Sequence, residues 1–295
     1  MRILVTGISS SLAVCVCKLA KEKSHYVIGT TRRPIDAGKP DFVDKLIYLD
    51  LLNEVSFRNL TDDDLDAVIH IAGLSYGSVS DLMKATGLGT YYLLRRVEEL
   101  NARAFVHVSG ISAFGIINGG TVNSETRVSY QTPYGVAKWA AETYLAENNG
   151  SVKRVSVRSP AIVGSVTAPH FLGQLVRKLI NQESKVLLKH PRFLFNNLIH
   201  EQDLALYLLW LADNTPDRYC CVPVGASEAI PLVDVVSFLV NVTRYRGVVE
   251  WVASSEEPFS IDLSEAQHLG FKPSSVLETL ERWAFSIDPA DLRFK

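Results

Sequence analysis

Six short apolar segments in the first half of the chain constrain its fold more than any other feature. They lie at Arg2–Thr6, Tyr26–Thr31, Lys45–Leu49, Ala67–Ile71, Ala104–Ser109 and Val152–Arg158. These segments lack the polar alternation of a half-solvated sheet, so we expect strands that are buried on both faces. Helical patterns separate them, at Leu12–Lys21, Thr90–Leu100 and Tyr134–Asn148. This rhythm predicts an α/β fold with a doubly wound parallel sheet that binds its ligand at the strand carboxyl ends.

The pattern changes after about Pro160. Helical segments continue at Phe171–Asn181, Glu201–Ala212, Leu232–Val240 and Ser274–Ala284, with turn-rich stretches between them. We therefore expect residues 1–160 to form a Rossmann-type domain. Residues 161–295 are expected to form mostly a small, irregular substrate-binding cap, interleaved with the sheet.

Composition narrows the classes of partner. The net charge of −2 provides no basic surface for nucleic acid or an anionic membrane, so we expect neither. The longest apolar stretch, near Leu204–Ala212, is too short to span a bilayer, and no signal peptide is visible, so we expect a soluble, cytoplasmic protein. The cysteines form two tight pairs without metal-ligand spacing, and we expect reduced thiols and no metal site. They are Cys15, Cys17, Cys220 and Cys221.

A serine-rich loop follows the first apolar segment and precedes the first helical one. Such a strand–turn–helix presents backbone N–H groups and a helix N-terminus to a pyrophosphate. Because Gly7 is its only glycine, the motif is weak by itself, and an ordinary serine-capped turn is the alternative. The candidate dinucleotide contacts in this loop are Gly7, Ser9, Ser10, Ser11 and Leu12.

The end of the second apolar segment indicates which dinucleotide is bound. A cofactor without a 2′-phosphate is usually held by an acidic residue at this point, whereas here the first acid is Asp36. Arginine forms bidentate bonds to phosphate, so Thr31, Arg32 and Arg33 predict NADP(H) in preference to NAD(H). The alternative is a solvated basic pair on a surface turn.

A series of motifs follows the successive strands in order. It comprises Thr6-Gly7, Leu49-Asp50-Leu51, His70-Ile71-Ala72-Gly73, Val106-His107-Val108-Ser109, Phe114-Gly115, Tyr134-Gly135-Val136-Ala137-Lys138 with Glu142, Arg158-Ser159-Pro160 and Leu198–Ala205. Over nearly the whole chain, this series resembles the extended short-chain dehydrogenase/reductase family of nucleotide-sugar epimerases, dehydratases and reductases.

The resemblance implies roles for the matching residues. Asp50 would bind the adenine amine, Tyr134 would be the acid/base, and Lys138 would be its partner. The segment from Pro160 to Val163 would line the nicotinamide carboxamide. The cofactor contacts implied in this way are Asp50, Leu51, Ile71, Ala72, Gly73, Val108, Tyr134, Lys138, Pro160, Ala161 and Val163.

The chemistry of the Tyr134–Lys138 pair also follows from its spacing. Residues four apart share one face of a helix. A free tyrosine has a pKa near ~10, and a neighbouring ammonium is expected to lower the pKa of Tyr134 towards neutrality. Lys138 can also hold the nicotinamide ribose and so orient the hydride donor.

Three departures from the family pattern matter. In the phosphate loop, Ser10 and Ala13 replace glycines. Gly110 stands where the family places its catalytic hydroxyl, so Ser112 or Ser109 is expected to supply it, unless both are turn serines with local backbone bonds.

The third departure concerns the substrate. Asn196 occupies the position of an arginine that often grips the nucleotide pyrophosphate, and the nearby Arg192 is a possible substitute. His200 is expected to be structural, as a lone histidine before a helix usually is.

These observations predict an NADP(H)-dependent enzyme that reduces or oxidises a sugar-nucleotide or related carbonyl. The alternatives are an NAD-dependent sugar-nucleotide 4-epimerase and a non-catalytic NADP(H)-binding sensor or scaffold. A dehydratase is less favoured, because Ile111-Ser112 stands where that branch carries an Asp-Glu pair. The family often dimerises through two helices that match Thr90–Leu100 and Tyr134–Asn148, so we expect a homodimer. Their candidate outward residues are Tyr91, Tyr92 and Trp139, and the alternative is that these side chains belong to the core.

Overall fold

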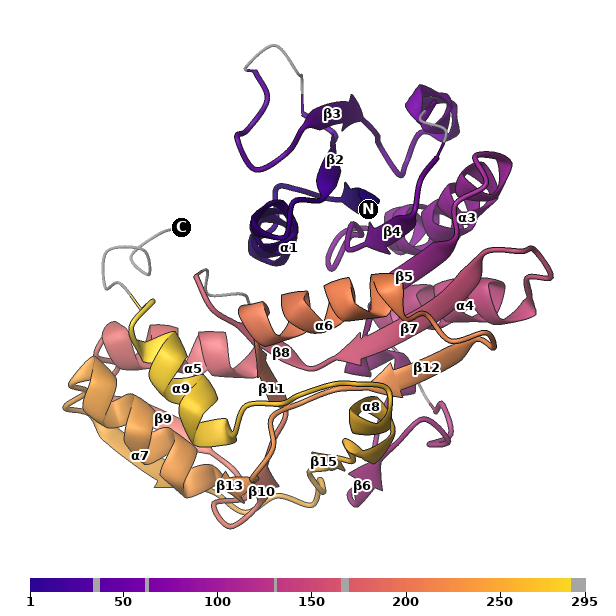
Figure 1. Ribbon diagram of the computed structural model, residues 1–295. Helices are drawn as coiled ribbons and strands as arrows, with labels where there is room; N and C mark the ends of the chain where they lie inside the picture. Colours follow the sequence, from indigo (N-terminus) through magenta and orange to yellow (C-terminus); the bar gives the residue numbers. More distant parts are fainter. Residues whose placement is uncertain (34–37, 62–63, 130–131, 166–169, 288–295) are drawn as a thin grey trace. The chain divides into compact units, whose positions relative to one another are not determined.

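The computed structural model describes residues 1–33, 38–61, 64–129, 132–165 and 170–287 (Figure 1). The chain forms two compact units, which are described separately. The first comprises Met1–Ile116, Thr126–Arg158 and Leu204–Val222. The second comprises Ile117–Glu125, Ser159–Asp203 and Pro223–Lys295.

The first unit is built on a seven-stranded sheet with the order β12-β7-β5-β4-β1-β2-β3. β1 pairs in parallel with β2 and β4, β2 with β3, and β4 with β5. The strands are β1 (Arg2–Thr6), β2 (Tyr26–Thr31), β3 (Lys45–Tyr48), β4 (Ala67–His70), β5 (Ala104–Gly110), β7 (Lys153–Ser159) and β12 (Cys220–Pro223). The predicted fold class and all six predicted strands are confirmed.

The helices of this unit follow from local capping and apolar periodicity. The Ser10 side chain caps α1, and the Thr132 side chain caps α4, whose first residue is Pro133. A π-helical turn, Met83–Leu88, joins α2 to α3, and a 3₁₀ turn, Ile111–Phe114, follows β5. The helices are α1 (Ser11–Glu22), α2 (Val79–Leu82), α3 (Gly89–Glu99), α4 (Pro133–Glu147) and α6 (Glu201–Asp213), which begins in the second unit.

The sheet is covered by an apolar core. Every residue of β4 and β5 is buried, which explains why their sequences show no polar alternation. Side chains of the sheet pack with those of α3 and α4. Representative members of this core are Leu4, Ile28, Val68, Phe105, Leu93, Leu94, Val97 and Leu145. This core fixes the carboxyl ends of the strands, where ligands of doubly wound folds bind.

The second unit has short strand pairs instead of a large sheet. Its strands pair as β8 with β11, β9 with β14, β6 with β15, and β10 with β13. They are β6 (Thr121–Val122), β8 (Ala161–Val163), β9 (Lys185–Leu188), β10 (Leu194–Phe195), β11 (Leu198–His200), β13 (Ile230–Pro231), β14 (Val248–Trp251) and β15 (Ser260–Ile261). Its helices are α5 (Phe171–Ile180), α7 (Leu232–Thr243), α8 (Ser264–His268) and α9 (Val276–Ala284). These elements surround a separate core that includes Leu172, Val235, Leu280 and Trp283.

The part of the chain that the structure describes contains no helix long and apolar enough to cross a membrane. The four cysteines, all within the described ranges, form no disulfide bond. Within the described ranges, no group of three or more metal-ligating side chains comes together.

Candidate active site

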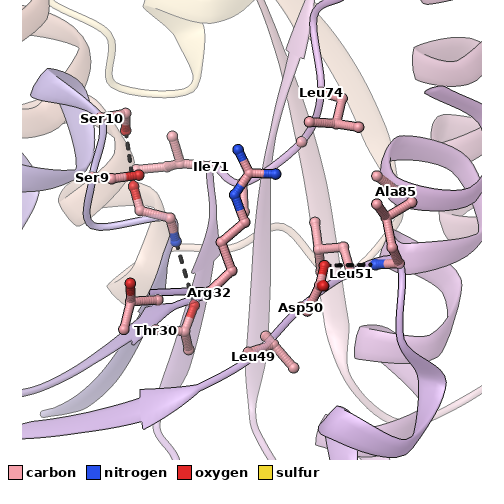
Figure 2. A pocket seen from close by; sticks show the side chains of 15 residues that line it. Ser9, Ser10, Thr30, Arg32, Leu49, Asp50, Leu51, Ile71, Leu74 and Ala85 are labelled. Carbon is pink, nitrogen blue, oxygen red and sulfur yellow. Dashed lines mark hydrogen bonds between the residues drawn. The ribbon is translucent and has the colours of Figure 1, made fainter. Parts of the chain in front are cut away.

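The strand order reverses at β1, because β2 and β3 follow on one side of it and β4 and β5 on the other. Doubly wound folds bind dinucleotides at this switch point. A pocket lies here, and Figure 2 shows its lining. The lining includes ten predicted residues: Gly7, Ser9, Ser10, Thr31, Arg32, Asp50, Leu51, Ile71, Ala72 and Gly73. It also includes five residues that were not among the predicted cofactor contacts: Thr30, Leu49, Leu52, Leu74 and Ala85.

The two loops that form the pocket floor are tied together. Gly7 has a φ of +74°, which is strained for any residue with a side chain, and an added Cβ would lie only 3.0 Å from the Ala72 Cα, so this position favours glycine. Thr6 Oγ1 accepts hydrogen bonds from the backbone N–H groups of Ile71 and Ala72, each at 3.0 Å. The loop after β1 and the loop after β4 are therefore held in close contact.

Ser10 takes the place of a glycine without strain. It has extended backbone angles, its hydroxyl oxygen accepts from the Ala13 N–H at 3.3 Å, and the hydroxyl donates to the Gly7 carbonyl at 3.1 Å. The loop is thus both a serine-capped turn and a wall of the pocket. Leu12 is buried in the core and, like Ser11, is not among the lining residues.

The two arginines after β2 differ in position. Figure 2 shows the Arg32 side chain between the Ser9 loop and Asp50, and Arg32 lines the pocket. Arg33 is exposed, is not a lining residue, and donates its backbone N–H to Thr31 Oγ1 at 3.0 Å. On the opposite wall, the Asp50 carboxylate accepts from the Leu52 N–H at 3.1 Å. Asp36 lies outside the described residues.

Tyr134 and Lys138 lie on α4. The Lys138 ammonium is buried, donates to the Val108 carbonyl at 2.7 Å, and lies 6.0 Å from the centre of the Tyr134 ring. A Cβ added to Gly73 would lie 3.9 Å from the Lys138 Nζ. The structure therefore places this pair beside the pocket, within one unit.

Burial sets the proton affinities of the pair. It raises the pKa of Tyr134 to about 12. Burial also lowers the pKa of Lys138 to about 8, against the opposing charge of Glu142. The predicted direction for Tyr134 was wrong, because that argument counted the neighbouring ammonium and omitted the burial of the phenol, which disfavours its charged form.

The two candidate hydroxyls have different surroundings. Ser109 is buried at the end of β5 and donates to Glu142 Oε1 at 2.5 Å. Ser112 lies on the 3₁₀ turn that packs against α4, and its buried hydroxyl has no hydrogen-bond partner among the described residues. Neither side chain makes the local backbone bond expected of a turn serine, and only Ser112 has an unengaged hydroxyl.

Three predicted cofactor contacts belong to the second unit. Ala161 and Val163 lie on β8, where they are in register with Leu198 and His200 of β11, and Pro160 precedes them. Their contact with the nicotinamide stays a prediction.

Asn196 has a structural role in the second unit. It is buried, donates to the Ile261 carbonyl at 2.8 Å, and accepts from the Ile261 N–H at 2.9 Å. Its amide is therefore used to hold β15, whereas Arg192 is exposed. His200 has the structural partners expected of it, because its Nδ1 lies 2.9 Å from the Arg282 guanidinium.

Comparison with known proteins identifies the family. The sequence profile described as the NAD dependent epimerase/dehydratase family matches residues 3–219. A dTDP-glucose 4,6-dehydratase from Streptomyces niveus is 28% identical over 169 residues, which cover 48% of this chain and 47% of that protein. A 3-ketodihydrosphingosine reductase from Bacteroides thetaiotaomicron is 24% identical over 159 residues, 48% of this chain and 55% of that protein. The chain spans about half the length of these curated relatives.

Solved structures share the fold over almost the full length. A UDP-glucuronic acid 4-epimerase from Bacillus cereus in complex with NAD superposes with a TM-score of 0.79 at 17% identity, covering 100% of both chains. A UDP-glucose 4-epimerase from Thermotoga maritima with UDP-glucose gives 0.77 at 19% identity, covering 97% of this chain and 98% of that one. MoeE5 in complex with UDP-glucose and NAD gives 0.76 at 20% identity, with the same coverage. Because the family profile extends over most of the sequence, this chain belongs to the NAD dependent epimerase/dehydratase family.

Proposed function

We propose that this chain is an NADP(H)-dependent oxidoreductase that reduces or oxidises a carbonyl carbon of a sugar nucleotide or a related molecule. The observation that carries the proposal is the position of the Lys138 ammonium beside Gly73, which brings the Tyr134–Lys138 pair to the dinucleotide pocket. A tyrosine and a lysine on a surface helix would have no such neighbour.

The residues of the pocket fit a dinucleotide. Gly7 allows the backbone to approach a pyrophosphate closely, and α1 begins beside Ser10, where its N-terminus favours negative charge. In this proposal Asp50 accepts from an adenine amine, and Lys138 holds a ribose. A bound nicotinamide dinucleotide supplies or accepts the hydride.

The proton chemistry belongs to Tyr134. Because burial raises its pKa, the phenol is protonated at neutral pH and can donate its proton to the oxygen of a carbonyl that is being reduced. The nearby Lys138 ammonium stabilises the phenolate that remains. Ser112 donates a hydrogen bond to the same oxygen and orients it. In the oxidising direction the phenolate form of Tyr134 accepts the proton of the substrate hydroxyl instead.

The preference for NADP(H) rests on Arg32, the arginine that lines the pocket. Its guanidinium is suited to a 2′-phosphate. The test is titration of the protein with NADPH and NADH, followed by energy transfer from tryptophan to the reduced nicotinamide. NADPH binding tighter by tenfold or more, about 1.4 kcal/mol, supports this preference, and tighter NADH binding contradicts it.

A sugar-nucleotide 4-epimerase is the second candidate. The observation that favours it is the fold shared with solved UDP-sugar 4-epimerases, one of them in complex with NAD. An epimerase converts a UDP-sugar without net change in the nicotinamide absorbance, whereas a reductase consumes NADPH in proportion to product.

A non-catalytic dinucleotide sensor remains as the third candidate, because Gly110 provides no hydroxyl and Ser109 is engaged by Glu142. Tyr134→Phe separates it from an enzyme. If the chain is an enzyme, Tyr134→Phe should lose most of the turnover of UDP-keto sugars and keep its affinity for the dinucleotide. A wild-type protein that binds NADPH and turns over none of these sugars supports the sensor.

A homodimer through α3 and α4 completes the proposal. Tyr91 on α3 and Trp139 on α4 are 36% and 44% exposed, while Tyr92 packs against Phe57. Two large exposed side chains on adjacent helices favour contact with a second copy of the chain.

A further inference from the structure

The Glu142 carboxylate is the centre of a buried polar cluster in the first unit. Its Oε1 accepts from the Ser109 hydroxyl at 2.5 Å and from the Arg158 Nε at 3.0 Å. Its Oε2 accepts from the Arg158 Nη2 at 2.7 Å. The carboxylate of α4 is thus bonded to the end of β5 and to the end of β7, which lie next to each other in the sheet.

Arg158 extends this cluster to the turn that carries Ser112. Its guanidinium carbon lies 4.2 Å from the centre of the ring of Phe114, the fully buried last residue of that turn. The same guanidinium therefore holds Glu142 by two hydrogen bonds and covers the face of Phe114. A lysine could not do both, because it lacks the planar fork.

We propose that Glu142 is a positioning residue that, with Ser109 and Arg158, fixes the Ser112 turn against the helix that carries Tyr134 and Lys138. This inference rests on the proposed function, since the alignment matters only if these three side chains meet a substrate. It assigns Ser109 to the support of the site and leaves the contact with the substrate to Ser112.

Glu142 has a second effect, because it lies one helical turn after Lys138. The groups that face Lys138 from the neighbouring strands are His70 on β4 and His107 on β5, both with a lowered pKa and therefore neutral. Tyr134, on its own helix, is a neutral phenol. Burial lowers the pKa of Lys138, and the negative charge of the Glu142 carboxylate opposes this by raising it. On its other side, Glu142 faces Arg158 and the thiol of Cys221, whose pKa burial raises.

The test compares Glu142→Gln with Glu147→Gln, which removes an exposed carboxylate from the same helix. Two measurements in this comparison do not depend on enzymatic turnover. One is the titration of the ¹³Cε resonance of Lys138, assigned by its loss in Lys138→Arg. The other is hydrogen exchange of the Ile111–Phe114 amides. In Glu142→Gln we expect the Lys138 midpoint to fall by about one pH unit, a tenfold change, and exchange of the turn to accelerate. Glu147→Gln should match wild type in both.

Because Glu142→Gln leaves Arg158 buried without its partner, the variant could fail to fold. The double variant Glu142→Gln/Arg158→Met removes the ion pair as a unit and keeps the measurement possible. An unchanged Lys138 midpoint or unchanged exchange of the turn, in the folded single or double variant, overturns the inference. Turnover by Tyr134→Phe tests the proposed oxidoreductase function alone, whereas the Lys138 titration and the hydrogen exchange test the positioning role of Glu142. Failure of the function and failure of the positioning role are therefore distinguishable.

Discussion

The Thr6 hydroxyl lies 2.8 Å from Nδ1 of the buried His70. Since this oxygen already accepts two backbone N–H groups, its own hydrogen points to the ring. The other ring nitrogen, Nε2, then donates to Thr90 Oγ1 at 3.0 Å, and Thr90 donates to the Thr86 carbonyl at 2.7 Å. His70 is therefore held neutral in a single tautomer at the end of β4, next to the loop that lines the pocket.

This arrangement predicts a loss of stability in acid. Burial lowers the pKa of His70 to about 3, whereas in the unfolded chain it titrates near ~6.5, so the unfolded state takes up a proton first. The free energy of unfolding should fall by about 1.4 kcal/mol per pH unit for this residue as the pH drops from about 6.5. His107, whose pKa is also lowered, adds to the slope. Urea denaturation at pH 7, 6 and 5 measures this pH dependence of the free energy of unfolding. His70→Asn should flatten the slope, and replacement of the exposed His268 should not.

Gly7→Ala should abolish tight dinucleotide binding. The added methyl would crowd the Ala72 backbone at a strained, positive φ, so the two loops must shift relative to each other. Gly120→Ala is the matched control, because this glycine has a φ of +79° and open space around it, in the other unit. We expect Kd for NADPH to rise at least ~10-fold in Gly7→Ala, a loss of about 1.4 kcal/mol, and to stay constant in the control. Equal Kd values in both variants would remove Gly7 from the binding site.

Arg32 and Arg33 provide another matched pair. Arg32→Ala should weaken NADPH binding by roughly 10-fold or more and leave NADH unaffected, since only NADPH carries the 2′-phosphate. Arg33→Ala should bind both dinucleotides like wild type, because Arg33 does not line the pocket. If the two variants are equally impaired, the effect is the general loss of positive charge and not recognition by Arg32.

Ser112 and Ser109 should differ in what they lose. Ser112→Ala removes a donor to the reacting oxygen, so kcat should fall by about 100-fold, with an unchanged melting temperature. Ser109→Ala leaves a buried carboxylate with one bond fewer, which should cost about 1–3 kcal/mol of stability. Steady-state turnover and urea denaturation of both variants separate the two roles. A larger loss of kcat in Ser109→Ala than in Ser112→Ala would reverse the assignment.

The proposed dimer is tested by Trp139→Asp. A charge within an apolar contact should dissociate it, so light scattering after gel filtration should report a monomer. Phe171→Asp places the same charge at another exposed aromatic residue, on α5, and should leave the mass unchanged. A wild-type protein that is monomeric at micromolar concentration would end the proposal.

Most of the fold could be predicted because its strands are continuous apolar runs. β1 and β2 have the predicted bounds. β12 was missed, because Cys220–Pro223 is short and becomes a strand by pairing beside β7, far away in the sequence. A run of only four residues is too short to show the periodic pattern by which a strand is recognised in a sequence.

The candidate site was predictable where motifs are local, as in the loop after β1 and the Tyr134–Lys138 spacing. The buried polar side chains that support the site could not be predicted from the sequence. Ser109, Glu142 and Arg158 lie on different elements, and nothing in their spacing shows that they meet. The prediction that the pKa of Tyr134 is lowered was wrong for a related reason, because the burial that raises it is a property of the folded chain.

The π-helical turn Met83–Leu88 has a consequence for any comparison of the pocket wall with that of another chain. A turn of this kind contains one residue more than an α-helical turn, so the α2–α3 segment has the form of a helix that gained a residue. Within this turn, the Thr86 hydroxyl accepts from the Leu74 N–H and donates to the Leu74 carbonyl. Deleting one residue here would restore a regular helix but rotate everything before the deletion by about 100°. If a related chain has a regular helix here, a comparison by sequence alone would therefore be shifted by one residue beside the pocket, and the partner of Leu74 in that chain must be found from structure.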